Sequence, residues 1–262
     1  MKQKIYQVDA FANRVFSGNP AAVCPLKEWL SDDVMQKIAK ENNLAETAFF
    51  VKEGDQYIIR WFTPAVEVDL CGHATLASAY VLFNHEGHKD AVIHFYSPRS
   101  GELSVTKKGN LLTMNFPSDA LKEVSLTEEL TAGFNLKPQS AVKGKTDYLL
   151  IYNNEKEIRD LVPDTDAIFK VDARGIIVTA PGDQADFVSR FFAPQVGVDE
   201  DPVTGSAHTS LTPFWAKKLQ KTELSAIQLS SRKGYLQCKY LNDRVEISGE
   251  AILYMTGEIF TD

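Results

Sequence analysis

The sequence predicts an α+β protein of two similar halves, each made of strands around one apolar helix. The pattern Phe-x-Pro-x-Val-x-Val-Asp occurs twice, at 62–69 and at 192–199. Each copy leads through a turn that contains Gly into an apolar segment typical of a buried helix. Strand-like alternating segments surround both copies. A long motif repeated at half-chain distance indicates two related halves that face each other.

Composition sets the broad class. The 262 residues are 44% hydrophobic and 24% charged, which is ordinary for a globular protein. A net charge of −7 argues against a nucleic-acid or anionic-membrane partner, and no apolar run approaches the length of a membrane span. The N-terminus enters a strand without a signal-peptide core. Three cysteines without a CxxC pair favour a reducing, cytoplasmic location.

The first half is predicted to run as strand, turn, helix, strand pair, buried helix and meander. Ser31 before Asp32 and Asp33 is a good helix start, because an N-cap residue precedes acids that suit the positive end of the helix dipole. The segment 74–83 is apolar nearly all round, which predicts a helix wrapped by sheet. Turn residues between the later alternating runs predict an antiparallel meander. The predicted strands are 5–11, 47–51, 57–62, 91–96, 102–106 and 111–116.

The second half repeats this plan with surface helices added at 127–134 and 155–162. Its buried helix is predicted over 207–219, where Pro213 removes one helical bond and predicts a kink or an early break. We expect the halves to span 1–117 and 118–250, with the last strand, about 251–262, returning to the first. The predicted strands are 148–152, 175–180, 187–192, 227–230, 235–240, 245–248 and 251–259.

Two glycine turns carry the first chemical hypothesis. A helix start after Gly72, and another after Gly205, would each present unpaired N–H groups and the positive end of a dipole, which suits an anion. If the halves face each other, both starts point into one cleft that could hold the carboxylate of a small acid. The turn at Gly18 and Asn19 has two interpretations, a purely structural turn or amides that face a ligand.

The titratable residues near these turns are Cys71, His73, Glu200, Asp201 and His208. The phosphate-binding, nucleophile-elbow and HExxH motifs are all absent. Ser206 and His208 are two residues apart at a helix start, so their side chains should not converge. A metal site from His73, Asp201 and His208 is disfavoured, and we predict no metal and no cofactor. Acid–base chemistry remains.

Pattern alone makes Glu46, which lies between two apolar segments, a solvated or capping carboxylate. Five motifs in order change this interpretation, because together they resemble the phenazine-biosynthesis F (PhzF-like) family of the diaminopimelate-epimerase fold superfamily. The motifs are Asp9-Ala10-Phe11, Gly18-Asn19-Pro20-Ala21, Asn43-Leu44-Ala45-Glu46-Thr47, Leu70-Cys71-Gly72-His73-Ala74-Thr75 and Glu200-Asp201-Pro202-Val203-Thr204-Gly205-Ser206-Ala207-His208.

The resemblance implies two pseudo-symmetric halves, each a strongly curved, mainly antiparallel sheet around a central helix. It also implies an active site between the halves, no cofactor, and a homodimer. The family's proton shuttle, which moves a proton between ring carbons of trans-2,3-dihydro-3-hydroxyanthranilate, falls on Glu46. Residues that orient and polarise the substrate fall on His73, Asp201 and Ser206. The further substrate-binding residues expected here are Asn19, Gly72, Ala74 and Gly205.

Related epimerases use two opposed cysteines. Cys71 stands where the first would be, but the matching turn of the second half has Thr204, so we interpret Cys71 as a buried structural thiol. The leading hypothesis is therefore a cofactor-independent isomerase acting on a small carboxylic acid. An amino- or hydroxy-acid epimerase, and a non-catalytic small-acid binding protein on the same scaffold, are the alternatives.

Overall fold

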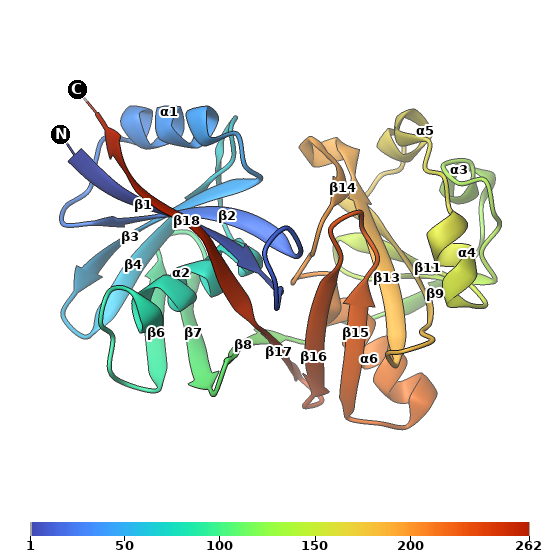
Figure 1. Ribbon diagram of the computed structural model, residues 1–262. Coiled ribbons are helices and arrows are strands. Elements are labelled where there is room, and N and C mark those ends of the chain that lie inside the picture. Colours follow the sequence, from blue (N-terminus) through green and yellow to red (C-terminus); the bar gives the residue numbers. More distant parts are fainter. Residues whose placement is uncertain (1, 262) are drawn as a thin grey trace. The chain divides into compact units, whose positions relative to one another are not determined.

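The computed structural model describes residues 2–261 and divides into two compact units (Figure 1). Unit 1 comprises Met1–Asn115 together with Ser248–Asp262, and unit 2 comprises Phe116–Ile247. The final strand, β18 (Ala251–Phe260), lies antiparallel to β1 (Lys2–Ala10), with Lys2 opposite Phe260 and Ala10 opposite Ala251. The last segment of the chain is therefore part of the same sheet as the first.

Unit 1 is one mixed sheet with a helix on each face. β1 pairs antiparallel with β2, β2 parallel with β3, β3 antiparallel with β4, and β4 parallel with β6. The meander β6–β7–β8 is antiparallel, as predicted. The bounds are β2 Asn19–Leu26, α1 Asp32–Asn42, β3 Glu46–Glu53, β4 Gln56–Phe62, β5 Glu67–Val68, α2 Gly72–Asn84, β6 Val92–Ser97, β7 Gly101–Lys108 and β8 Leu111–Pro117.

The two helices of unit 1 explain why its strands are apolar on both faces. Helix α1 packs on β3 and β4, and α2 packs on β1, β2, β3 and β18 from the opposite face (Figure 1). Ala22 and Cys24 of β2 join the cluster beneath α1, whereas Ala21 and Val23 alternate to the other face, and all four are buried. Helix α2 is buried over most of its length, which confirms the predicted sheet-wrapped helix.

Unit 2 repeats the strand pairings of unit 1 in the same order. β10 pairs antiparallel with β11, β11 parallel with β12, β12 antiparallel with β13, β13 parallel with β15, and β15 antiparallel with β16. The bounds are β9 Lys122–Val124, α3 Glu128–Thr131, β10 Ser140–Lys143, β11 Asp147–Ile151, α4 Glu155–Asp160, α5 Thr165–Phe169, β12 Gly175–Pro181, β13 Phe187–Ala193, η1 Pro194–Val196, β14 Val198–Asp201, α6 His208–Leu219, β15 Glu223–Gln228, β16 Gly234–Tyr240 and β17 Arg244–Gly249.

An arginine–glutamate pair recurs at the motif that first indicated the repeat. In unit 1, Nε and Nη2 of Arg60 donate to the two carboxylate oxygens of Glu67 at 2.7 and 2.8 Å. In unit 2, Nε and Nη2 of Arg190 donate to the two carboxylate oxygens of Glu200 at 2.7 and 2.9 Å. Two parallel N–H···O bonds fix both partners, so each pair holds a short strand against its neighbour. Glu200, one of the titratable residues near the second turn, is thus engaged in a structural pair.

The sequence predicted that Pro213 would either kink its helix or end it early, and the predicted early end is wrong. Helix α6 runs through Pro213 to Leu219. Proline cannot donate to the carbonyl oxygen of Thr209 four residues earlier, but the backbone N–H of Asp119 donates to that oxygen at 3.1 Å. Asp119 also accepts from the Ser210 hydroxyl at 2.7 Å. The lost helical bond is replaced from a neighbouring segment, and the helix continues.

Two predicted surface helices are shorter than expected. The helix expected over 127–134 covers only Glu128–Thr131, and that expected over 155–162 ends at Asp160. In the latter case Leu161 is already extended, and Pro163 two residues later cannot continue a helix. Across residues 2–261, no helix is both long enough and apolar enough to cross a bilayer.

Candidate active site

Three elements of unit 1 begin at one edge of its sheet, and each supplies a polar side chain there. Asn19 is the first residue of β2 and Glu46 the first of β3. Because these strands are parallel, with Ala21 opposite Glu46, their starts lie at the same edge. Helix α2 also starts there, with Cys71 as N-cap and His73 in the first turn. The fold thereby gathers residues that are more than fifty positions apart in sequence.

His73 lies at the centre of this group. Its Nδ1 is 3.2 Å from Nδ2 of Asn19 and 3.5 Å from Sγ of Cys71. Its Nε2 is 3.2 Å from Oε2 of Glu46. The His73 and Glu46 side chains are 6% and 18% exposed, and the two facing atoms are shielded from solvent. The structure therefore brings three of the predicted residues, Asn19, Glu46 and His73, into one contact group.

Burial fixes the charge state of the imidazole. Loss of hydration lowers the pKa of His73 to about 3, so the ring is neutral near pH 7 and carries one N–H. An amide N–H and a thiol both approach Nδ1, which makes Nδ1 the acceptor and places the proton on Nε2. Within residues 2–261, Nε2 makes no hydrogen bond, although Glu46 is close. A buried donor of this kind is suited to a substrate atom.

The first turn of α2 adds backbone donors to the group. The N–H groups of Gly72, His73 and Ala74 have no acceptor in the described part of the chain, as expected for a helix start. Ala74 itself is fully buried, so a ligand that uses its N–H would have to approach along the start of the helix. The hydroxyl of Thr75 donates back to the Cys71 carbonyl at 2.6 Å, which secures the turn.

The predicted residues of unit 2 lie on the turn between β14 and α6. Asp201 ends β14, and its Oδ2 accepts from the Thr204 hydroxyl at 2.5 Å. Gln228 of β15 holds the same turn, because its side chain accepts from Thr204 N at 2.9 Å and donates to the Asp201 carbonyl at 2.8 Å. Gly205 follows, buried, with Ser206 half-buried beside it. Asp201 and Thr204 are thus fixed before any ligand binds.

Ser206 and His208 point to different partners, as predicted. Nδ1 of His208 donates to the Thr204 carbonyl oxygen at 2.9 Å, which assigns its proton to Nδ1. Burial lowers the pKa of His208 to about 4. The Ser206 hydroxyl instead accepts from Nη1 of Arg174 at 3.0 Å. Ser206 and His208 therefore do not contact each other through these atoms, as their spacing predicted.

Sequence reasoning missed Arg174. It directly precedes β12, and the carboxylate it contacts, Asp147, begins the parallel neighbour β11. In the sequence Arg174 lies in a polar stretch without a motif, and only the pairing of the two strands brings it to the Ser206 turn. Knowledge of the repeat could have found it, since Gly175 of β12 occupies the position that Glu46 occupies in β3.

Glu46, Cys71 and His73 also have the spacing of metal ligands, with one ligand atom from each within 4.8 Å of the others. Carboxylate oxygen, thiolate and imidazole are all groups that Zn²⁺ accepts. Glu46 and His73 are also suited to act as acid and hydrogen-bond donor without a metal, and the prediction of no resident metal stays a prediction.

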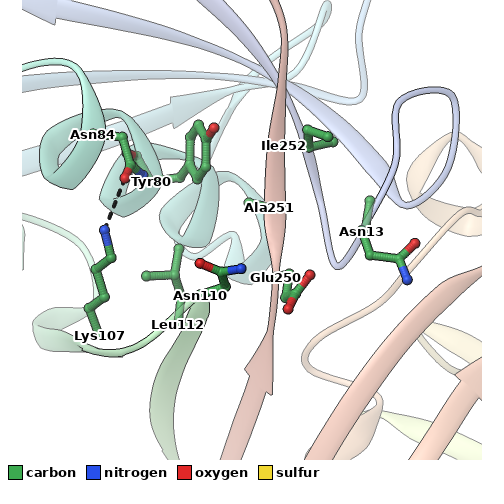
Figure 2. Close-up of a pocket in the computed structure, with 10 residues that line it drawn as sticks. Asn13, Tyr80, Asn84, Lys107, Asn110, Leu112, Glu250, Ala251 and Ile252 are labelled. Atoms are coloured by element: carbon green, nitrogen blue, oxygen red, sulfur yellow. Dashed lines mark hydrogen bonds between the residues drawn. The ribbon is translucent and has the colours of Figure 1, made fainter.

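A separate hollow of about 260 Å³ lies in unit 1 and contains none of the predicted residues (Figure 2). Lys107 and Asn84 meet on its wall, where Nζ donates to Oδ1 at 2.9 Å. Asn13, Asn110 and Glu250 add polar groups. The hollow has no buried acid beside a histidine, so we place the candidate site at Glu46 and His73 instead.

Comparison with known proteins identifies the family of the chain. The model of the family "PhzC-PhzF: Phenazine biosynthesis-like protein" matches residues 8–257. An uncharacterized isomerase of Pseudomonas aeruginosa is 51% identical over 259 residues, covering 99% of both chains. A human phenazine biosynthesis-like domain-containing protein is 39% identical over 287 residues, again covering 99% of each.

Solved structures agree with the fold. A PhzF-family phenazine biosynthesis protein from Enterococcus faecalis has a TM-score of 0.97 and 47% identity, with 100% of both chains covered. A hydroxyproline epimerase from Agrobacterium vitis has a TM-score of 0.61 at 8% identity, covering 98% of this chain and 92% of that one. The latter likeness concerns the fold alone, and together they confirm the predicted fold class.

Proposed function

The chain belongs to the PhzC-PhzF family of phenazine biosynthesis-like proteins, and from that premise we propose that it is an isomerase that moves a proton on a small carboxylic acid by acid–base catalysis without a cofactor. The observation that carries the proposal is the contact of Glu46 with a neutral, buried His73. A carboxylate can take a proton from carbon and return it elsewhere, while a neutral N–H stabilises the charge that develops.

The proposed roles follow from the atoms that face each other. Oε2 of Glu46 and Nε2 of His73 are 3.2 Å apart, so they would act on neighbouring atoms of one substrate. Glu46 removes and returns the proton. The Nε2–H of His73 polarises the adjacent substrate group, because it makes no hydrogen bond within the described residues.

The other predicted residues enter the proposal as binding groups. Asn19 holds the tautomer of His73 through its 3.2 Å contact with Nδ1. The N–H groups of Gly72 and Ala74, and those of Gly205 and Ser206, are suited to a carboxylate or another anionic group. Asp201 would receive an amino or hydroxyl group. That both sets serve one substrate in a cleft between the halves is carried over from the family resemblance, as are the homodimer and the cytoplasmic location.

The decisive experiment replaces Glu46 by glutamine. A thermal-shift screen of small carboxylic acids first supplies ligands, including trans-2,3-dihydro-3-hydroxyanthranilate, and NMR in D₂O then follows deuterium entry into each. Glu46→Gln should fold and bind but lose about 10²- to 10⁴-fold in exchange rate. Glu53→Gln, at the exposed far end of the same strand, is the matched control and should exchange at the wild-type rate. Unchanged exchange in Glu46→Gln would reject the proposal.

Substitution of Cys71 distinguishes an isomerase that shifts a double bond from a two-base epimerase. Its thiol is buried and 3.5 Å from Nδ1 of His73. Under the isomerase proposal the thiol transfers no proton to substrate, so Cys71→Ala should keep exchange within about tenfold of wild type and shift a double bond. An epimerase that uses Cys71 as its second base would instead lose exchange from one face of the substrate, which product stereochemistry reveals.

A further inference from the structure

Arg174 of unit 2 is held in place more firmly than a surface arginine. Its Nε donates to Oδ1 of Asp147 at 2.9 Å and its Nη2 donates to Oδ2 of the same carboxylate. Asp147 is 2% exposed. The guanidinium also lies over the ring of Phe191, 5.3 Å from its centroid. A forked ion pair and an aromatic face together fix the plane of the guanidinium.

The fixed guanidinium has donors left over. Arginine has five N–H groups, of which two are directed to Asp147 and one to the Ser206 hydroxyl at 3.0 Å. One N–H on each terminal nitrogen therefore has no acceptor within residues 2–261. The side chain is 34% exposed, so these donors are accessible to a ligand. Since Arg174 donates to Ser206, the hydroxyl is free to turn its own proton toward the same ligand.

The repeat shows where Arg174 stands in the scheme of the fold. Glu46 is the first residue of β3 and contacts His73, in the first turn of α2. In unit 2 the equivalent strand is β12, and the residue before it, Arg174, contacts Ser206, the counterpart of His73 on the equivalent turn. The turn is thus approached by an acid at the first position of β3 in unit 1, and by a guanidinium one residue before β12 in unit 2, where Gly175 holds the position equivalent to Glu46.

We propose that Arg174 is the residue of unit 2 that binds the carboxylate of the substrate, acting with the hydroxyl of Ser206. This inference rests on the proposed function and narrows it, because it requires a substrate with a full negative charge on the group that unit 2 holds. A guanidinium matches a carboxylate in shape and charge, whereas a neutral carboxamide offers one acceptor oxygen and its own donors. The Asp147–Phe191 setting keeps the fork oriented before the ligand arrives.

The test compares acids with their neutral amides by NMR titration. The probes are 2-aminobenzoate with 2-aminobenzamide, cyclohex-1-enecarboxylate with its carboxamide, and proline with prolinamide. We expect wild type to prefer at least one acid over its amide by about 10- to 100-fold, the range of a charge-assisted bond. Replacing Arg174 alone would strand the buried Asp147, so the main variant is the double substitution Asp147→Asn with Arg174→Gln, which leaves a neutral pair. Its acid-to-amide ratio should fall below about threefold.

Two further variants separate recognition from stability and from net charge. Arg174→Lys keeps the cation beside Asp147 but loses the fork, so it should restore part of the preference. Lys156→Gln removes one positive charge from an exposed site of the same unit and should leave the ratio unchanged. A purely structural Arg174 would change the melting temperature without changing the ratio.

The outcomes are distinguishable from those of the proton-transfer test. Glu46→Gln should retain the acid preference while it loses exchange. If no acid is preferred over its amide by wild type, or if the double variant with the neutral pair keeps the wild-type ratio, the assignment of Arg174 is wrong and the Glu46 proposal still stands. Loss of the ratio in the double variant, with exchange abolished only in Glu46→Gln, would establish both.

Discussion

His208 should make unit 2 less stable as the pH falls from 7.5 to 5.0. The residue is fully buried against Phe187 and donates from Nδ1 to the Thr204 carbonyl. Burial lowers its pKa from 6.5 to about 4, against a smaller opposing effect of the Thr204 bond. The unfolded chain therefore binds a proton near pH 6.5, whereas the folded chain binds it only near pH 4. The free energy of unfolding decreases as the pH falls between these two values.

The magnitude follows from the two pKa values. At pH 5.0 an unfolded histidine with a pKa of 6.5 is almost fully protonated, whereas the folded residue is mostly neutral. The resulting loss in the free energy of unfolding is about 2 kcal/mol relative to pH 7.5. His208→Asn removes the titrating ring and keeps an N–H donor for Thr204. The variant should therefore lose about 2 kcal/mol less than wild type over the same interval.

Urea titrations followed by tryptophan fluorescence at both pH values measure this difference. Trp215 is a suitable reporter because it is buried in α6 and stacks on Phe187, which also contacts His208. If the two units unfold separately, the transition that Trp215 reports is the one to analyse. Only the change with pH is compared, so any constant cost of the substitution cancels. Equal losses in wild type and variant would show that His208 titrates freely in the folded protein.

Two further predictions concern the turn and the thiol of unit 1. Gly18 has a φ of +67°, and a Cβ there would overlap the Ala10 carbonyl oxygen and come within 2.7 Å of the Ala12 Cβ. In urea titrations, Gly18→Ala should therefore lower the free energy of unfolding by about 2 kcal/mol more than Gly54→Ala, whose φ is +60° in open space. An equal cost of the two substitutions would contradict the close approach at Gly18. Micromolar Zn²⁺ should slow deuterium exchange by wild type and slow it much less in Cys71→Ala, because the thiol is the third ligand beside Glu46 and His73. Equal inhibition of both proteins would show that the metal binds elsewhere.

Much of the fold was predictable because local pattern and tertiary packing agree. The buried helix of unit 1 was recognisable from residues 74–83, since a segment apolar on every side needs sheet around it. The repeated motif indicated two halves, and the pairings of the two sheets follow the same order. The continuation of α6 through Pro213 was not predictable, because the replacement donor is the backbone of Asp119, some ninety residues away. Sequence shows the lost bond but not the group that restores it.

The candidate site likewise contains residues that the sequence predicted and one, Arg174, that it did not. Pattern alone made Glu46 a solvated acid, and only the family resemblance gave it a role. The contact with His73 depends on the packing of α2 against β2 and β3, which no local signal encodes. No local signal indicates Arg174 for a similar reason, since its partners Asp147 and Ser206 come from two other segments and only comparison of the two halves points to its strand. The role of each charged residue depends on which other strands and turns meet at the sheet edge where its own strand begins. That arrangement is set by the strand pairing of the whole sheet and not by the local sequence.

The two turns are chemically different although the strands around them pair in the same order. Duplicated topology places the start of β3 beside the first turn of α2 and the start of β12 beside the turn that precedes α6, and the side chains at these two places differ. A carboxylate such as that of Glu46 is suited to taking and returning a proton, whereas a guanidinium such as that of Arg174 is suited to pairing with an acid. A shuttle that takes a proton and returns it needs one group that titrates and another that holds the substrate still. Under the proposed function Glu46 would be the first of these groups and Arg174 the second. A second acid at Gly175 is excluded, because a Cβ there would come within 2.6 Å of the Phe191 ring and 2.7 Å of the Phe192 carbonyl oxygen.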